Sequence, residues 1–504
     1  MSQDYNSTLN LPKTDFPMRA NLPEKEPQIL EYWENMDIYK KMLEKNENKP
    51  SYILHDGPPY ANGDIHLGHA LNKILKDIVV KYKNMNGFKA PYVPGWDTHG
   101  LPTEIKARTK FGAEKAKQMS DLEIRKLCKE FALGYVKKQK EGFKRLGVLG
   151  DWNNPYITLY PEYEAEQVRT FAKMASKKGT IYRGLRPVYW CPSCETALAE
   201  AEIEYHNDKC HSIYVKSPVV DDKGKLSKMG VDVSNTYFVI WTTTAWTLPA
   251  NVAICVGPEF EYAIVKSGEE YYIVADVLKE KVMQAADIEN YELVGKILGS
   301  DLEYMQARHP FLDRNSLIIV GDHVTTESGT GCVHTAPGHG AEDFEVCKNY
   351  KNLPVIVPVN SKGVLTSEAE NFAGLDIHKA GKAIYDYLKE TGHLFASKTF
   401  EHQYPHCWRC KSEIIFRATE QWFCSVDNFK KEALEAVETV NWNPAWGKDR
   451  MISMISERKD WCISRQRVWG VPIPIFFCKN CGKELIDENI MMNIADIFEK
   501  EGSD

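Results

Sequence analysis

The chain has 504 residues, of which 43% are hydrophobic and 26% charged, and its formal net charge is −7. This size and apolar content allow a large buried core shared among about three domains, and the negative charge argues against a protein coated in basic residues for non-specific nucleic-acid binding. No run of about 18 apolar residues occurs, and the polar stretch Met1–Asn10 has no hydrophobic signal core. We therefore expect a soluble, cytoplasmic protein with no membrane partner.

Residues 1–49 predict an extended arm followed by a packing helix. The arm is proline-rich between Pro12 and Pro27, and proline fixes φ and lacks the amide hydrogen that a helix interior needs. Apolar residues then recur at helical spacing from Gln28 to Glu44, which indicates a helix with one buried face.

Residues 50–186 alternate strand-like and helix-like patterns, which is typical of an α/β, doubly wound parallel sheet of the Rossmann type. Such a sheet binds ligands at the carboxyl ends of its strands. Ser51–Leu54 predicts a short buried strand, a Gly/Pro-rich loop follows it, and Leu67–Tyr82 has helical spacing. Asp97 closes the next expected strand. We interpret this region as the first half of a catalytic, nucleotide-binding domain.

His66 and His69 lie three residues apart at the start of this helix, so both rings face the same side of its first turn. Gly68 between them leaves room for a flat group against the backbone, and the amino ends of helices bind phosphate. The pattern therefore suits a bound nucleotide. From the spacing alone, a His-x-x-His metal pair or two ordinary surface histidines fit about equally well.

The 13 cysteines, in a chain without a secretory signal, indicate thiols and metal ligands rather than disulfides. Two Cys-x-x-Cys pairs together offer four thiolates for a closed tetrahedral Zn²⁺ site, although one pair alone could be redox-active. The long interval between them makes sense if an inserted domain leaves and re-enters at a metal-pinned hinge. A third pair, Cys478 and Cys481, has no second pair after it and is expected to be incomplete. The four expected zinc ligands are Cys191, Cys194, Cys407 and Cys410.

Segments such as Thr236–Trp241 and Ser316–Val320 are β-rich and separated by Gly, Asp and Asn turns, which indicates an inserted domain. The helix-like run Phe429–Val440 follows its end. We therefore expect the first half of the catalytic domain at 50–186, a β-rich insertion at 205–398, and a shortened second half of the catalytic domain at 416–504. Zinc-knuckle strands at 187–204 and 399–415 are expected to form a zinc ribbon at the hinge.

Several of these motifs resemble a known enzyme family. Residues 66–69, His-Leu-Gly-His, are similar to the His-x-Gly-His signature of class I aminoacyl-tRNA synthetases, and segments 57–63 and 95–102 resemble the isoleucyl branch of that family. The threonine-rich segment 241–251 and the segment 331–344 resemble the two parts of the family's editing domain. The resemblance implies a monomer that activates isoleucine with ATP and Mg²⁺, transfers it to the tRNA for isoleucine, hydrolyses valyl products and holds a structural Zn²⁺.

The resemblance also assigns roles to residues. An editing site is needed because a pocket that fits isoleucine cannot strongly reject valine, a limit for which isoleucyl enzymes are themselves the standard case. The resemblance implies that His66 and His69 act in catalysis and that these two bind ATP together with Gly68. It implies that isoleucine is bound by Gly57, Pro58 and Asp97, with Asp97 accepting its ammonium group. The implied editing residues are Thr242, Thr243, Thr244, Asn251, His334 and Asp343.

Family members also carry a Lys-Met-Ser-Lys-Ser loop that grips ATP, and this string does not occur in the 504 residues. The resemblance therefore implies a chain that is incomplete for activation. Three other interpretations stay open: a valyl-type class I synthetase, a nucleotidyltransferase that uses the same histidines, and a non-catalytic zinc-ribbon fragment that binds nucleic acid.

Overall fold

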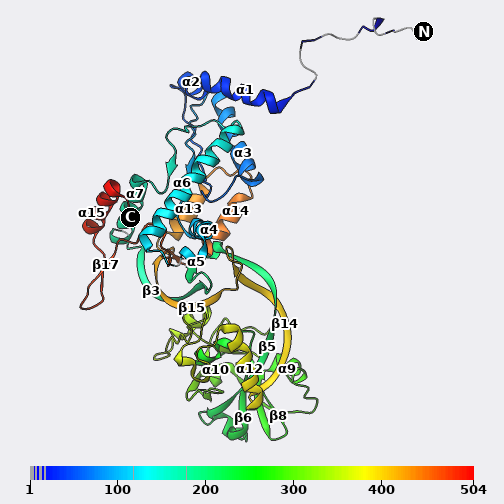
Figure 1. The fold of residues 1–504 in the computed structure, drawn as a ribbon. Helices are drawn as coiled ribbons and strands as arrows, with labels where there is room; N and C mark the ends of the chain where they lie inside the picture. Colours follow the sequence, from blue (N-terminus) through cyan, green and yellow to red (C-terminus); the bar gives the residue numbers. More distant parts are fainter. Residues whose placement is uncertain (1–4, 6–7, 11–13, 16–18, 117, 178) are drawn as a thin grey trace. The chain divides into compact units, whose positions relative to one another are not determined.

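The computed structural model describes residues 5, 8–10, 14–15, 19–116, 118–177 and 179–504, and the expected arm around Pro12 and Pro17 lies outside them. The chain forms two compact units, one of Met1–Lys173 with Arg467–Asp504 and one of Met174–Gln466 (Figure 1). The domain divisions expected from the sequence stay predictions. Across the described residues, no helix is both long enough and apolar enough to cross a membrane.

The first unit begins with two helices, α1 (Leu22–Asn35) and α2 (Ile38–Lys45), where the sequence predicts a single helix over 28–44. The break falls at Asp37, whose φ of 50° lies in the left-handed region that interrupts a right-handed helix. The expectation of an extended chain as far as Pro27 is also wrong. A proline in the first turn of α1 is tolerated because the amides there have no intrahelical acceptor.

A short parallel sheet forms the centre of the first unit. β1 (Gly95–Trp96) pairs in parallel with β2 (Tyr156–Ile157), and a parallel bridge joins Tyr60 to Asp97. The parallel pairing predicted for this region is therefore present, and Asp97 follows directly on the end of β1.

The prediction of a buried strand over Ser51–Leu54 is wrong. Only Ser51 forms a bridge, to Lys89, and Ile53 is 69% exposed. The segment is extended, but its short apolar run has no second strand on its other side, so it buries no face.

Helices enclose this sheet and bury large side chains such as Trp96 and Phe143. The longest of them begins after a capping box, in which Ser120 and Glu123 each accept a hydrogen bond from the other's backbone amide. The further elements of this unit are α3 (Leu67–Met85), as predicted, α4 (Leu101–Phe111), α5 (Ala113–Ala116), α6 (Asp121–Arg145), α7 (Pro161–Ser176, which continues into the second unit), α15 (Glu488–Glu501), and the hairpin of β17 (Phe476–Phe477) and β18 (Glu484–Leu485).

The second unit is built on a mixed sheet whose strands are β5 (Ile203–Asp221), β6 (Thr236–Thr242), β7 (Ala253–Val256), β8 (Glu261–Ser267), β9 (Glu270–Ala275), β10 (Glu292–Leu298), β11 (Gln306–Arg308), β12 (Asn315–Val320), β13 (Cys332–Thr335) and β14 (Leu394–Cys407). The pairings run from β6 through β13, β7, β12, β11 and β5 back to β6, so these strands close into a barrel. The strands predicted at Thr236–Trp241 and Ser316–Val320 are confirmed as β6 and β12.

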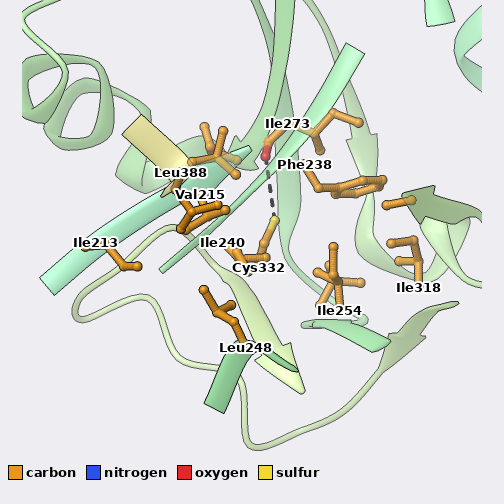
Figure 2. Packing of buried hydrophobic residues seen from close by; sticks show 14 of the residues in the cluster. Ile213, Val215, Phe238, Ile240, Leu248, Ile254, Ile273, Ile318, Cys332 and Leu388 are labelled. Carbon is orange, nitrogen blue, oxygen red and sulfur yellow. Dashed lines mark hydrogen bonds between the residues drawn. The ribbon is translucent and has the colours of Figure 1, made fainter. Parts of the chain in front are cut away.

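Aliphatic side chains from these strands meet in one buried cluster (Figure 2). Ile240, Ile254 and Ile318 are buried in it, as expected where alternate side chains of a strand point to the same face. Cys332 lies among them, and its thiol donates a hydrogen bond to the carbonyl of Ile273, with Sγ and O 3.6 Å apart. This cysteine therefore belongs to the core.

The chain enters and leaves the barrel through a long ribbon in which β5 and β14 lie side by side (Figure 1). A second sheet has the order β16 (Trp461–Cys462), β15 (Ile415–Cys424), β3 (Ile181–Cys191) and β4 (Thr196–Leu198). The helices of this unit are α8 (Lys225–Lys228), α9 (Lys279–Ala285), α10 (Gly299–Leu302), α11 (Ala341–Cys347), α12 (Ile377–Glu390), α13 (Lys430–Glu438), which confirms the predicted helix near 429–440, and α14 (Gly447–Ser456).

Candidate functional site

The imidazoles of His66 and His69 stack at the amino end of α3, with their ring centroids 3.9 Å apart. Nδ1 of His66 accepts a hydrogen bond from the amide of Gly68 at 3.1 Å, and Nδ1 of His69 accepts one from the amide of His66 at 3.3 Å. Each ring therefore carries its hydrogen on Nε2, which leaves two N–H donors at a helix end that favours anions.

Two further observations bear on this stack. A Cβ at Gly68 would lie 3.0 Å from Cε1 of His66, so a larger residue there would push the ring away. Burial lowers the pKa of His69, and the neighbouring His66 and Lys73 lower it further. The ring of His69 is therefore a neutral hydrogen-bond donor at pH 7.

Asp97 lies beside the loop that contains Gly57 and Pro58. Its amide donates a hydrogen bond to the carbonyl of Pro59, and its carbonyl accepts one from the amide of Ala61. The nitrogen–oxygen distance is 3.0 Å in both. Burial raises the pKa of the Asp97 carboxyl, although nearby His99 opposes the rise. Within the described part of the chain, no lysine or arginine pairs with this carboxylate. The structure thus pairs the backbone of Asp97, a half-buried acid, with Pro59 and Ala61, which directly follow Gly57 and Pro58 in the chain.

A buried ionic cluster fixes the same loop and is not evident from the sequence. The Asp56 carboxylate is hydrogen-bonded to the ammonium groups of Lys73 and, at 2.7 Å, Lys76, and it accepts the amide of Gly95 at 3.1 Å. Burial alone would raise the pKa of Asp56, but the two lysines hold it below its usual range. In the sequence, an aspartate before Gly-Pro predicts only a turn, and two lysines at helical spacing predict a solvated face.

Gln139 on α6 is a second positioning residue that the sequence does not reveal. Its side-chain oxygen accepts from Trp96 Nε1 at 2.9 Å, and its Nε2 donates to the carbonyls of Tyr60 at 3.0 Å and Gly63 at 2.7 Å. The amide therefore joins β1 to the loop before α3. No local pattern could have indicated this role, because the partners are distant in sequence.

The four predicted zinc ligands meet in the second unit. Their sulfur atoms all lie within 4.8 Å of one another, and those of Cys191 and Cys410 are 3.4 Å apart. A tetrahedral Zn²⁺ with Zn–S bonds of about 2.3 Å separates its sulfurs by about 3.8 Å, so this donor set fits zinc. Cys191 ends β3 and Cys407 ends β14, which is why residues so far apart in the sequence converge.

Cys478 and Cys481 are both exposed and lie at the turn of the β17–β18 hairpin. Among the described residues, no third Cys, His, Asp or Glu side chain gathers around them in a metal-binding group. The pair is therefore a two-ligand knuckle in this part of the chain.

A buried hydrogen-bond chain links several of the expected editing residues. Asn251 Nδ2 donates to Nδ1 of His334 at 2.7 Å, so the Nε2 hydrogen of that ring is directed at the Thr247 hydroxyl, 3.0 Å away. Thr247 in turn donates to the carbonyl of Thr244 at 2.8 Å, and the Thr242 hydroxyl accepts the amide of Thr244 at 3.1 Å. Burial lowers the pKa of His334 to about 3, so this ring is neutral at pH 7. Thr247 also belongs to this hydrogen-bond chain, although the sequence does not predict a role for it.

Two of the expected editing residues lie outside this chain of hydrogen bonds. Asp343, in the first turn of α11, accepts the amide of Ala336 at 2.9 Å, and burial raises its pKa. Ala336 directly follows the strand that carries His334, so the carboxylate borders the cluster. Thr243 is half-buried, and its hydroxyl makes no hydrogen bond to any residue that the structure describes.

A family model described as "tRNA synthetases class I (I, L, M and V)" matches residues 28–504. Proteins named isoleucine–tRNA ligase from Caldicellulosiruptor saccharolyticus and Thermoanaerobacter sp. strain X514 are 60% and 59% identical to this chain over 501 residues. These alignments cover 99% of the chain but 54% and 53% of the relatives, so the chain spans about half of their length. A crystal structure of the LeuRS-tRNA-LeuAMS ternary complex from Agrobacterium radiobacter K84 aligns with 94% of this chain. The alignment covers 53% of the solved chain, at 17% identity and a TM-score of 0.38.

Proposed function

Because the chain belongs to the class I tRNA synthetase family (I, L, M and V), we propose that it carries the amino-acid activation and editing parts of an isoleucine–tRNA ligase. The enzyme would form isoleucyl-adenylate from isoleucine and ATP with Mg²⁺, pass isoleucine to its tRNA, and hydrolyse valyl products. The observation that carries the proposal is the His66–His69 stack at the amino end of α3, in a chain 60% identical to a protein named isoleucine–tRNA ligase. That identity favours isoleucine over valine as the substrate.

Activation requires the isoleucine carboxylate to attack the α-phosphorus of ATP while pyrophosphate leaves. The protein therefore has mainly to position the reactants and stabilise the charge that develops on phosphate oxygens. The Nε2–H groups of His66 and His69 would donate to those oxygens, assisted by the amino end of α3. Gly68 would let the nucleotide approach the backbone.

Asp97 would bind the ammonium group of isoleucine, since its carboxylate is half-buried and pairs with no lysine or arginine among the described residues. Gly57 and Pro58 would form the wall against the aliphatic side chain. Asp56 and Gln139 would act as positioning residues, because both hold the loop that presents this wall.

The barrel unit would hydrolyse valyl-tRNA for isoleucine. Asp343 would anchor the ammonium group of the misattached valine, and the hydroxyl of Thr243 would contact the adenosine end of the tRNA. Asn251, whose buried side chain donates to His334 and accepts from Ser316, would support the site from within the protein. Hydrogen bonds on both nitrogens hold the His334 ring in one orientation, so it would limit the size of the pocket. Thr242 and Thr244 would shape the same wall.

A structural Zn²⁺ would be held by Cys191, Cys194, Cys407 and Cys410. Four thiolates leave no open coordination position, so the ion would act as a cross-link and not as a catalyst. It would pin the end of β3 and the turn after it to the end of β14, the strand that leaves the barrel.

Equilibrium binding of an isoleucyl-sulfamoyl adenosine tests the proposal on the purified chain. We expect it to bind about tenfold or more tightly than the leucyl counterpart, because the pocket would be shaped for one branched side chain. Asp97→Asn should weaken the isoleucyl compound, whereas Asp64→Asn, at an exposed aspartate of the same loop, should not. Equal binding of the two compounds would contradict the isoleucine assignment.

A further inference from the structure

A second cluster of metal-ligating side chains lies on the β5–β14 ribbon, apart from the four cysteines. Residues paired in register on two antiparallel strands project to the same face, as do alternate residues along each strand. In this ribbon Asp208 pairs with His402, and Glu204 pairs with His406. Asp208 and His406 therefore project from one face, although they belong to different strands.

Glu413 brings a second carboxylate to the same place. It follows the Cys407–Cys410 knuckle, and an antiparallel bridge joins its backbone to that of His406. One ligand atom each from Asp208, His406 and Glu413 lie within 4.8 Å of one another. His378, at the start of α12, has its Nδ1 3.7 Å from a Glu413 oxygen.

The hydrogen bonding at this cluster points to a cation. His406 is only 8% exposed, and its Nδ1 donates to the carbonyl of Tyr404 at 3.0 Å, which leaves Nε2 as the ring nitrogen available to a metal ion. That nitrogen is 3.3 Å from Oδ2 of Asp208, a buried oxygen that accepts no hydrogen bond from any described residue. A buried carboxylate oxygen that accepts no hydrogen bond is costly unless a positive charge lies beside it.

We propose that Asp208, His406 and Glu413 form a second divalent-metal site, which takes a first-row transition ion such as Zn²⁺. One imidazole nitrogen and two carboxylates are donors that such ions accept, and the two negative charges match a dication. The ion would join three separate stretches of chain, one on β5, one on β14 and one after the cysteine knuckle. The proposal concerns the stiffness of the ribbon and does not depend on the proposed ligase activity.

Equilibrium dialysis of the purified chain against Zn²⁺, followed by elemental analysis, tests this site. We expect two ions per chain, one at the cysteines and one here. Asp208→Asn and Glu413→Gln should each lose one ion and keep the other, since the amides are the same size but bind metals weakly. Glu401→Gln is the matched control, because Glu401 lies on the opposite face of β14 and should leave both ions in place. Circular dichroism would verify that each variant is folded.

Cobalt(II) substitution separates the two sites by their spectra. The cysteine site should give strong sulfur-to-metal charge-transfer absorption, whereas the nitrogen and oxygen ligands should add only weak ligand-field bands, which disappear in Asp208→Asn. A single bound ion in the unaltered chain would mean that His406 and Asp208 form an ion pair only, and would overturn the proposal. Retention of the second ion by either variant would overturn it equally, as adventitious binding.

Discussion

A half-buried carboxylate without a basic partner is costly unless a ligand supplies the counter-charge. Asp97 is such a group, because burial raises its pKa and no lysine or arginine of the described residues neutralises it. By contrast, Asp56 is more deeply buried but is satisfied by two lysines within the protein. The two acids thus differ at the residue scale: Asp56 is paired within the protein, whereas Asp97 has no lysine or arginine partner among the described residues and is the acid that we propose for the substrate.

Replacing Asp97 should separate the amino-acid pocket from the nucleotide site. Asp97→Asn should weaken isoleucine binding about 30-fold or more, because losing one partner of a buried charge pair costs about 2 kcal/mol or more. ATP binding should change little. Calorimetric titration with each ligand measures both, and an equal loss for the two ligands would remove Asp97 from the amino-acid pocket.

Replacing Asp56 should affect stability. Asp56→Asn leaves Lys73 buried without its counter-charge, so the free energy of unfolding should fall by about 3–5 kcal/mol. Urea unfolding measures the loss. Asp64→Asn, which breaks the exposed pair with Lys138, is the control and should behave almost like the unaltered chain. Similar small losses in both variants would show that the Asp56 cluster contributes little.

At the scale of elements, the parts that could be predicted carry their own local pattern. Helix α3 begins at residue 67 because His66 caps it, and β6 shows the β-branched and aromatic run expected of a strand. The break at Asp37 and the unpaired segment at Ser51–Leu54 could not be predicted, because helical or strand-like patterns continue through both and only tertiary pairing decides.

Three buried histidines make the second unit sensitive to acid. Burial lowers the pKa of His309 and His334 to about 3 and that of His339 to about 4. An unfolded histidine titrates near 6.5, so below that pH the unfolded chain takes up protons that the folded chain does not. The contribution of these neutral histidines to the free energy of unfolding is therefore fully present above pH 6.5. It should fall as the pH is lowered towards 4, by about 1.4 kcal/mol per pH unit for each histidine.

The variant His334→Gln isolates one histidine. It should be less stable at pH 7, because it loses the hydrogen bonds to Asn251 and Thr247. Between about pH 6.5 and 4.5, however, its free energy of unfolding should fall less steeply with pH than that of the unaltered chain. The two slopes should differ by about 1.4 kcal/mol per pH unit, the value for one proton. Denaturant unfolding at several pH values gives both slopes. Identical slopes would contradict the low pKa of His334.

The cysteine cluster gives a second element-scale prediction. Cys407→Ala should lower the zinc content by one ion per chain and destabilise the joint between β3 and β14, because a structural zinc site contributes directly to folding. Elemental analysis and thermal unfolding measure the two effects. Cys424→Ala, at a buried cysteine outside the cluster, is the control for zinc content. An unchanged zinc content in Cys407→Ala would show that the knuckles do not share a metal.

At the scale of the whole molecule, the sequence indicates a β-rich insertion between two cysteine pairs, and the structure has a barrel there. Closure of that barrel was beyond sequence reasoning, because it depends on β6 meeting both β5 and β13, which are far apart in the chain. The same holds for Gln139, whose partners lie on a distant loop. The roles predicted from the motifs stay predictions, and the residues that hold these segments in place are revealed only by tertiary pairing.

The central claim is that one chain combines an isoleucine pocket with an editing site for valine. Its most direct test is the hydrolysis of valyl-tRNA for isoleucine by the purified chain, with isoleucyl-tRNA as the competing substrate. We predict faster hydrolysis of the valyl ester. The activity should be lost in Asp343→Ala, which removes the proposed ammonium anchor, and retained in Glu342→Ala, whose side chain is exposed. Equal hydrolysis of the two esters, or activity indifferent to Asp343→Ala, would contradict the account.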